Sequence, residues 1–271
     1  MDNPKVLFVN QEISPYLKDS HISLLSRSLS QGIQEMGKEV RTFMPRFGLI
    51  NERRNQLHEV IRLSGMNLVI NDTDHPLIIK VASIQAARMQ IYFIDNEDYF
   101  HKKIMFHDRN GKFADDNDEK AIFFSRGVIE TIKKLSWSPD IIHCNGWFSC
   151  LTPLYIKRMY KDNPLFANTK VVLSLYGDNF KGNLHSNFSK KLKFDNITPA
   201  EIAKYGDFAH EDLLKMAIDF SDGIIMGDEE DNINATLIKH AKKTGKPILP
   251  YQGPDNYIEA FDNFYDKILL N

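Results

Sequence analysis

Short apolar runs that alternate with helix-periodic segments constrain the fold of this chain more than any other feature of its sequence. Lys5–Asn10 is such a run and is typical of a buried parallel strand. The apolar residues that follow recur every three or four positions, as on one face of a helix, and Gly37 stands where a helix-ending glycine is expected. Val40–Met44 is a second strand-like run, stopped by Pro45. The chain therefore opens as a strand–helix–strand unit of a parallel sheet.

The same alternation returns in the second half of the chain. Four further strands are predicted at Asp140–Cys144, Val171–Leu175, Gly223–Met226 and Lys246–Leu249. Helices are predicted over Asp118–Leu135, Trp147–Tyr160, Asp207–Phe220, a segment from an Asp228 N-cap to Lys243, and Asn256–Leu270. The polar segments 98–118 and 182–199 are expected to be loops. This alternation predicts a doubly wound α/β fold, a parallel sheet covered by helices on both faces.

The region from Leu57 to Ile94 follows a different pattern. Its strand-like runs Met66–Ile70, Leu77–Ala82 and Met89–Ile94 are joined by polar turns without helical periodicity. Such a pattern predicts a β-hairpin insertion appended to the sheet. The sequence assigns this insertion no role.

Composition excludes several classes of partner. The 271 residues are 42% hydrophobic and 26% charged, as in an ordinary globular protein, and suffice for a core without disulfides. A net charge of -2 gives no general attraction to nucleic acid or to an anionic membrane. No apolar stretch approaches the roughly 18–20 residues of a membrane span. The N-terminus has no signal-peptide pattern and the chain has two cysteines, Cys144 and Cys150, so we expect reduced thiols and a cytoplasmic location.

The common cofactor and metal motifs are missing. The loop after Asn10 lacks the glycines of a dinucleotide fingerprint. Gly177–Gly182 resembles a phosphate loop only superficially, because Asn183 stands where a lysine is required. The two cysteines form no Cys-x-x-Cys pair. We therefore expect no cofactor and no metal, and we look for function in the loops beyond the carboxyl ends of the strands, where ligands of open α/β sheets bind.

Five stretches, in the same order along the chain, resemble the glycogen/starch synthase family, whose enzymes have the two-domain GT-B fold. They are Lys5–Lys18, Val40–Ile50, Asp118–Arg126, Pro139–Trp147 and Leu151–Lys157. The resemblance implies that residues 1–250 form a single N-terminal GT-B half, a Rossmann-like α/β domain, with the family's second domain absent. It also implies that residues 251–271 are the GT-B return helix packed on the same domain, although an unrelated capping helix is an equal alternative.

The resemblance places a nucleotide-sugar site in the loop after the first strand. The family's Lys-Thr-Gly-Gly-Leu-Ala-Asp loop matches Lys18–Leu24 of this chain. This match implies Lys18, Ser20 and His21 as nucleotide-sugar-binding residues. Both glycines have been replaced by residues with side chains, and Asp19 adds a negative charge that opposes phosphate binding.

A glucan site is implied by two later loops. Asn145 and Trp147 match the family's segment His-Asp-Trp, and Tyr176 stands at the position of the histidine that contacts the transferred glucose. The match implies Asn145, Trp147 and Tyr176 as glucan-binding residues. Tyr176 can hydrogen-bond but cannot carry the positive charge of an imidazolium ion. Trp147 is either a stacking platform for a sugar or part of the core. No catalytic residue is assigned.

Three functions remain open at this point. The family transfers glucose from ADP-glucose to α-1,4-glucan, so the chain is either such an enzyme completed by a partner chain or a non-catalytic relative. A relative of that kind would bind glucan, a nucleotide sugar, a protein partner or a second copy of itself. The third possibility is a different enzyme on the same scaffold. The altered loop and Tyr176 favour a protein that is inactive alone.

Overall fold

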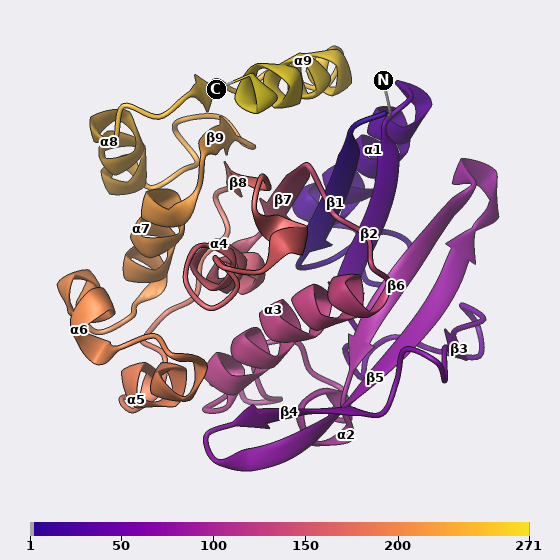
Figure 1. Cartoon of the computed structure of the whole chain (residues 1–271), viewed down its shortest axis with the longest axis vertical. Coiled ribbons are helices and arrows are strands. Elements are labelled where there is room, and N and C mark those ends of the chain that lie inside the picture. The colour runs from indigo at the N-terminus through magenta and orange to yellow at the C-terminus, as the bar shows by residue number, and fades with distance from the viewer. Residues whose placement is uncertain (1–2, 271) are drawn as a thin grey trace.

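The computed structural model describes residues 3–270 as one large sheet with helices on both sides (Figure 1). The strands are β1 (Lys5–Asn10), β2 (Glu39–Pro45), β3 (His58–Glu59), β4 (Met66–Ile70), β5 (Thr73–Ile84), β6 (Met89–Asp95), β7 (Ile141–Asn145), β8 (Lys170–Leu175), β9 (Gly223–Met226) and β10 (Ile248–Leu249). The α-helices are α1 (His21–Glu35), α2 (Glu97–Phe100), α3 (Asn117–Lys134), α4 (Leu151–Lys157), α5 (Phe188–Leu192), α6 (Pro199–Ile202), α7 (His210–Phe220), α8 (Ala235–Lys243) and α9 (Tyr257–Leu269).

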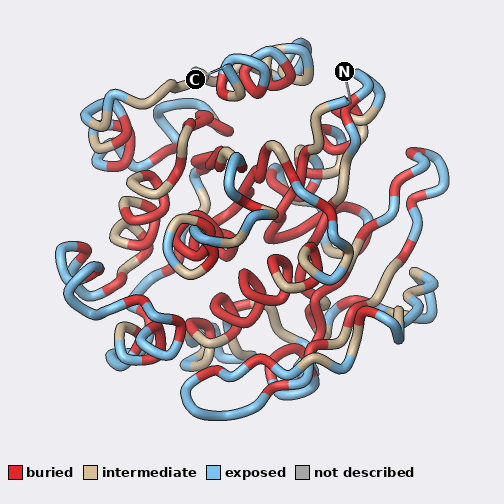
Figure 2. Tube along the Cα trace, viewed as in Figure 1, coloured by how far each residue is buried: buried red, intermediate tan, exposed pale blue. Residues whose placement is uncertain are grey.

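Successive residues of β1 point to opposite faces of the sheet, and both faces are buried. Val6 and Phe8 belong to an apolar cluster with residues of α1 and α9. Leu7 and Val9 belong to a second cluster with residues of α3, α4 and α7. Figure 2 shows the central strands buried along their length, while hairpin tips and loops are exposed. The predicted doubly wound α/β fold is therefore confirmed.

The strands run in the order β10-β9-β8-β7-β1-β2-β6-β5-β3, with β4 paired to β5. The pairs from β10 to β6 are parallel, and β5 runs antiparallel to β6. Asn71 and Asp72, in the turn between β4 and β5, both have the positive φ that a two-residue hairpin turn requires. The predicted hairpin insertion is present, and it joins the main sheet because β6 pairs in parallel with β2.

Several predictions about local structure are wrong or incomplete. Asp228 does not cap α8, which is capped by the side chain of Asn234 through a 2.9 Å hydrogen bond from the amide of Thr236. The carboxylate of Asp228 instead accepts a hydrogen bond from Asn232. Segment 182–199 is not wholly a loop, since it contains α5 and leads into α6.

The sequence around α6 does carry a signal for the start of that helix. Thr198 and Glu201 form a capping box, in which both the amide and the hydroxyl of Thr198 donate to the Glu201 carboxylate at 2.8 Å, and Pro199 occupies the first helical position. This Thr-x-x-Glu signal predicts a helix start. Segment 98–118 likewise contains the end of the short helix α2, and the helix predicted over 147–160 is divided at Cys150 into a 3₁₀ turn (Trp147–Ser149) and α4.

Helix α9 packs against α1, and both helices cover the face of the sheet that carries Val6 and Phe8. Gly32 permits this close approach, because a Cβ at that position would lie 2.5 Å from the side chain of Ile258. The Tyr265 hydroxyl lies 2.6 Å from Nδ1 of His143, which is buried in β7. The Lys38 ammonium forms ion pairs with two carboxylates of α9. These contacts tie α9 to the sheet, and its identity as a GT-B return helix stays a prediction. No helix within residues 3–270 is long and apolar enough to cross a membrane.

Candidate functional site

The carboxyl ends of β1, β7, β8 and β9 lie at one edge of the sheet. Register places Asn10 beside Asn145, and Asn145 beside Ser174. Leu175 at the end of β8 is likewise paired with Met226 at the end of β9. The loops that carry the predicted site residues therefore meet at this edge, as the strand-end rule requires.

A buried chain of polar side chains links these strand ends. The Tyr176 hydroxyl donates to Oδ1 of Asn145 at 2.6 Å, and Nδ2 of Asn145 donates to Oδ1 of Asn10 at 2.9 Å. Asn10 and Asn145 are fully buried, and Tyr176 is 2% exposed. Burial raises the pKa of Tyr176 well above its ordinary value, so its hydroxyl stays protonated as a donor. The Tyr176 hydroxyl proton is therefore used in a buried hydrogen bond to Asn145.

The first turn of α1 is capped by its own serines. The Ser20 hydroxyl accepts from the amide of Ser23 at 3.0 Å, and the Ser23 hydroxyl accepts from the amide of Ser20 at 2.8 Å. Asp19, just before the cap, accepts a 2.8 Å hydrogen bond from the Ser14 hydroxyl. A helix N-terminus attracts anions through its unpaired amides. In α1 the capping serines satisfy the Ser20 and Ser23 amides internally, and Asp19 places a negative charge beside the remaining ones.

His21 joins α1 to the end of β9. Its Nε2 lies 2.9 Å from the carbonyl oxygen of Gly227, and its ring lies edge-on to Tyr176 with 6.1 Å between centroids. Gly227 fits closely against Tyr176, since a Cβ there would lie 2.4 Å from the phenol ring. The sequence reasoning missed Gly227, although a glycine directly after a strand at the ligand edge is a recognisable signal. His21 thus links α1 to the end of β9 beside Tyr176, while its own side chain stays exposed.

Trp147 is buried in an aromatic cluster. Only 3% of the residue is exposed, and its ring packs against Phe106 and Phe180 at centroid distances of 4.7 and 4.6 Å. The loops at this edge pack over three buried side chains, those of Asn145, Trp147 and Tyr176. Direct contact of these three residues with glucan stays a prediction, and it would require them to become exposed.

Asp178 and His210 lie behind Trp147 and were not singled out by the sequence. The Asp178 carboxylate accepts from the backbone amide of Trp147 at 3.1 Å, and burial together with nearby Glu12 raises its pKa to about 6. His210 Nε2 lies 4.0 Å from the other Asp178 oxygen, too far for a hydrogen bond, and burial lowers the His210 pKa to about 4. At neutral pH this pair is therefore a carboxylate facing a neutral imidazole.

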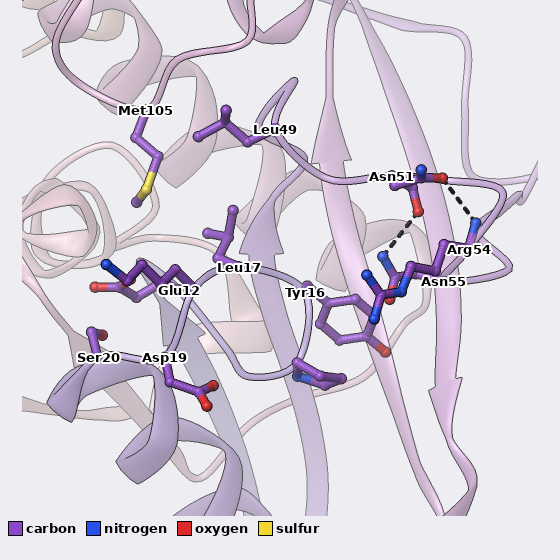
Figure 3. A pocket seen from close by; sticks show the side chains of 12 residues that line it. Glu12, Tyr16, Leu17, Asp19, Ser20, Leu49, Asn51, Arg54, Asn55 and Met105 are labelled. Carbon is purple, nitrogen blue, oxygen red and sulfur yellow. Dashed lines mark hydrogen bonds between the residues drawn. The ribbon is translucent and has the colours of Figure 1, made fainter.

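An open cavity lies on the other side of the β1–α1 loop, with a volume of about 690 Å³ (Figure 3). Its walls come from the β1–α1 loop, the turn that follows β2, and the segment after α2. The lining residues are Glu12, Pro15, Tyr16, Leu17, Lys18, Asp19, Ser20, Leu49, Asn51, Arg54, Asn55 and Met105.

Two of the predicted nucleotide-sugar-binding residues, Lys18 and Ser20, line the cavity, and the third, His21, does not. Burial raises the pKa of Glu12, which also lines the cavity, although hydrogen bonds from Ser20 and Gln11 act in the opposite direction. The sequence reasoning missed the contribution of 49–55, and the Asn- and Arg-rich turn after β2 was the available signal. Within residues 3–270 no group of three or more His, Cys, Asp or Glu side chains is arranged to hold a metal.

Comparison with known proteins gives a consistent result. The starch synthase catalytic domain family matches residues 5–230. The glycogen synthase of Chlorobium limicola is 35% identical over 257 residues, which cover 91% of this chain and 52% of the relative. That of Chlorobaculum tepidum is 39% identical over 175 residues, 64% of this chain and 36% of the relative. The catalytic domain of starch synthase IV from Arabidopsis thaliana, bound to ADP and acarbose, is a structural neighbour with a TM-score of 0.69, 16% identity, and coverage of 94% of this chain and 52% of that one.

These similarities differ in what they establish. At 16% identity, the structural likeness shows the fold alone. The chain spans about half the length of the Chlorobium limicola glycogen synthase, so the activity of that whole protein does not transfer with the match. The family match extends over most of the chain and agrees with the five resembling stretches. The chain belongs to the glycogen/starch synthase family.

Proposed function

We propose that this protein is a non-catalytic member of its family that binds α-1,4-glucan in the cavity beside the β1–α1 loop. The cavity carries the proposal: its 690 Å³ fall within the roughly 300–1,000 Å³ of small-molecule sites. It combines the amide groups of Asn51 and Asn55 with apolar surface from Leu17, Leu49 and Met105. Sugar hydroxyls suit the amides, and the C–H faces of a pyranose suit the apolar side chains.

A nucleotide diphosphate is the less suitable ligand for the first turn of α1. Ser20 and Ser23 satisfy two amides that an anion would otherwise contact. Asp19 repels a phosphate placed there, and His21 occupies the space toward Gly227. Lys18 is the one element of the family's loop that favours phosphate. The balance supports glucan over ADP-glucose.

The absence of catalysis in the isolated chain follows from Tyr176. The family's histidine at this position contacts the transferred glucose, whereas Tyr176 is buried and donates to Asn145. Transfer of a glucosyl group needs preorganised groups that stabilise developing charge. A buried phenol with its proton committed elsewhere supplies little of this stabilisation.

Isothermal titration with maltotetraose and with ADP, together with a radiolabel assay for glucosyl transfer from ADP-glucose to glycogen, tests the proposal. We expect maltotetraose to bind, ADP to bind at least tenfold more weakly, and no label to enter glycogen above a heat-killed control. Asn55→Ala should weaken maltotetraose binding because Asn55 lines the cavity. Asn67→Ala, exposed on β4, is the matched control and should bind like the parent. Label in glycogen, or equal loss of binding in both variants, contradicts the proposal.

A glucosyltransferase completed by a partner chain is the second candidate. Leu24 and Leu49, on α1 and on the cavity wall, are 48% and 49% exposed near the ligand edge, where a partner domain would cover them. Adding the separately produced C-terminal half of a full-length relative to the transfer assay tests this candidate, because activity should appear only in the mixture. A cytoplasmic location belongs to either proposal and is supported by the two free, buried thiols, Cys144 and Cys150.

A further inference from the structure

The cavity is chemically polarised along its length. Figure 3 shows Glu12, Asp19 and Ser20 at one end and Tyr16, Arg54 and Asn55 at the other. The acidic end borders the first turn of α1. The other end is formed by the turn after β2. The lining carries two cations, Lys18 beside Asp19 in the β1–α1 loop and Arg54 in the turn after β2. A ligand that fills the cavity therefore meets two carboxylates with a neighbouring lysine in the β1–α1 loop, and an arginine at the other end.

The positive charge of Arg54 is not neutralised locally. Two acids of this region, Glu52 and Asp95, form a closed ring of ion pairs with Arg46 and Lys80, at N–O distances from 2.7 to 3.2 Å. Two carboxylates are thus matched by two other cations. Among the described residues no carboxylate pairs with the Arg54 guanidinium, which is exposed to solvent.

The groups around Arg54 present hydrogen-bond donors. The side-chain Oδ1 of Asn51 accepts from the backbone amide of Arg54 at 2.9 Å, and this contact leaves the Asn51 NH₂ group available as a donor. The Tyr16 hydroxyl has no hydrogen-bond partner within residues 3–270. Burial raises the pKa of Tyr16 to about 12, although Arg27 opposes the rise, so the hydroxyl remains a donor at neutral pH. A guanidinium, an amide and a phenol form a set of donors suited to a multivalent oxyanion.

We propose that the cavity takes a phosphorylated sugar, with the phosphate ester at the Arg54 end and the sugar ring toward Glu12. This inference rests on the proposed glucan-binding function and narrows its ligand class. The phosphate oxygens accept from Arg54, Asn51 and Tyr16, while sugar hydroxyls donate to the Glu12 carboxylate. A nucleotide diphosphate at α1 would place its charge at the opposite, acidic end, so the two modes of anion binding are distinct.

Isothermal titration at low ionic strength with four ligands tests the inference: maltotetraose, the same oligomer bearing a 6-phosphate, glucose 1-phosphate and inorganic phosphate. The phosphorylated oligomer or glucose 1-phosphate should bind the parent protein roughly 10- to 100-fold more tightly than neutral maltotetraose, as one charge-assisted contact allows. Which of the two binds more tightly identifies the source of the phosphate ester. Arg54→Ala should remove this advantage and Arg54→Lys should retain part of it. Arg53→Ala is the control, because Arg53 is exposed on the same turn but does not line the cavity, and it should change nothing.

Equal weakening in Arg53→Ala and Arg54→Ala would overturn the inference, since the effect would then be general charge. Inorganic phosphate binding as tightly as the sugar phosphates would also overturn it, because the sugar would contribute nothing. Maltotetraose binding without any preference for phosphate removes the inference and leaves the proposed function intact. Tight binding of a sugar phosphate through Arg54, with no binding of maltotetraose, supports the inference and contradicts the proposed binding of neutral glucan.

Discussion

The two halves of the ligand edge are built in opposite ways. In the closed half, the side chains of Asn145, Trp147 and Tyr176 are buried, and exposed His21 and buried Gly227 lie against Tyr176. The open half, the 690 Å³ cavity, leaves donors and acceptors of the β1–α1 loop and the following turn facing solvent. The same loop borders both halves. The sequence positions Asn145, Trp147 and Tyr176, which match the family's site by resemblance, are therefore buried, while a neighbouring surface stays open to solvent.

The largest expected difference between the halves is in stability. Trp147→Ala removes a ring packed among Phe106, Phe113, Phe148 and Phe180, and should lower the free energy of unfolding by about 3–5 kcal/mol. Arg54→Ala in the open half should change it by less than about 0.5 kcal/mol, since Arg54 is exposed. Urea denaturation of both variants measures the contrast. A Trp147→Ala protein as stable as its parent would show that the closed half is not the packed support described above.

Asp178, which binds the Trp147 amide, and neighbouring His210 should give opposing pH dependences of stability. The pKa of Asp178 is raised to about 6, so the folded state holds its proton more tightly than the unfolded state does. The contribution of Asp178 to stability therefore falls as pH rises from about 4 to 6, by on the order of 3 kcal/mol. The pKa of His210 is lowered to about 4, so the unfolded state takes up its proton first as pH falls. The contribution of His210 is therefore lost as pH falls from 6.5 to 4.

Single variants separate the two contributions. Asp178→Asn leaves His210 alone, so its stability relative to the parent should increase as pH rises from about 4 to 6. His210→Asn leaves Asp178 alone, and its stability relative to the parent should decrease over the same range. Buried His143 is present in every variant and cancels in these differences. Thermal unfolding at half-unit pH steps measures them, and parallel curves for all three proteins would contradict the assigned shifts.

The sequence predicted the doubly wound sheet because its strands are apolar runs that must be buried on both faces. The side chains of Val6 to Val9 point alternately toward the two helical layers, and an apolar run of this length is typical of a strand buried on both faces. The hairpin insertion was equally readable from its lack of helical periodicity. The errors were local: Asp228 competed with Asn234 as a cap, and nothing in the sequence near either residue decides which one begins the helix.

The candidate site was harder to predict because burial is a property of tertiary contacts. Resemblance pointed to Lys18, Ser20 and Tyr176, and register does bring their loops together. It did not reveal that Tyr176 would be covered by His21 and Gly227, which lie far apart along the chain. The turn containing Arg54 is rich in Asn and Arg, but its approach to the cavity depends on the path of the chain after β2.

Two tyrosines, one in each half, provide the most direct test of the comparison. Tyr176→Phe removes the donor to buried Asn145 Oδ1 and should cost about 1–3 kcal/mol of unfolding free energy, seen as a fall of a few degrees in melting temperature. Tyr16→Phe removes a hydroxyl with no partner among residues 3–270, so its melting temperature should stay unchanged. Ligand binding should behave in the opposite way: Tyr16→Phe should weaken binding of the phosphorylated oligomer severalfold, and Tyr176→Phe should leave it unchanged while the protein is folded. If Tyr176→Phe instead abolished binding without loss of stability, the Tyr176 hydroxyl would have to reach the ligand, and the division into a closed and an open half would be wrong.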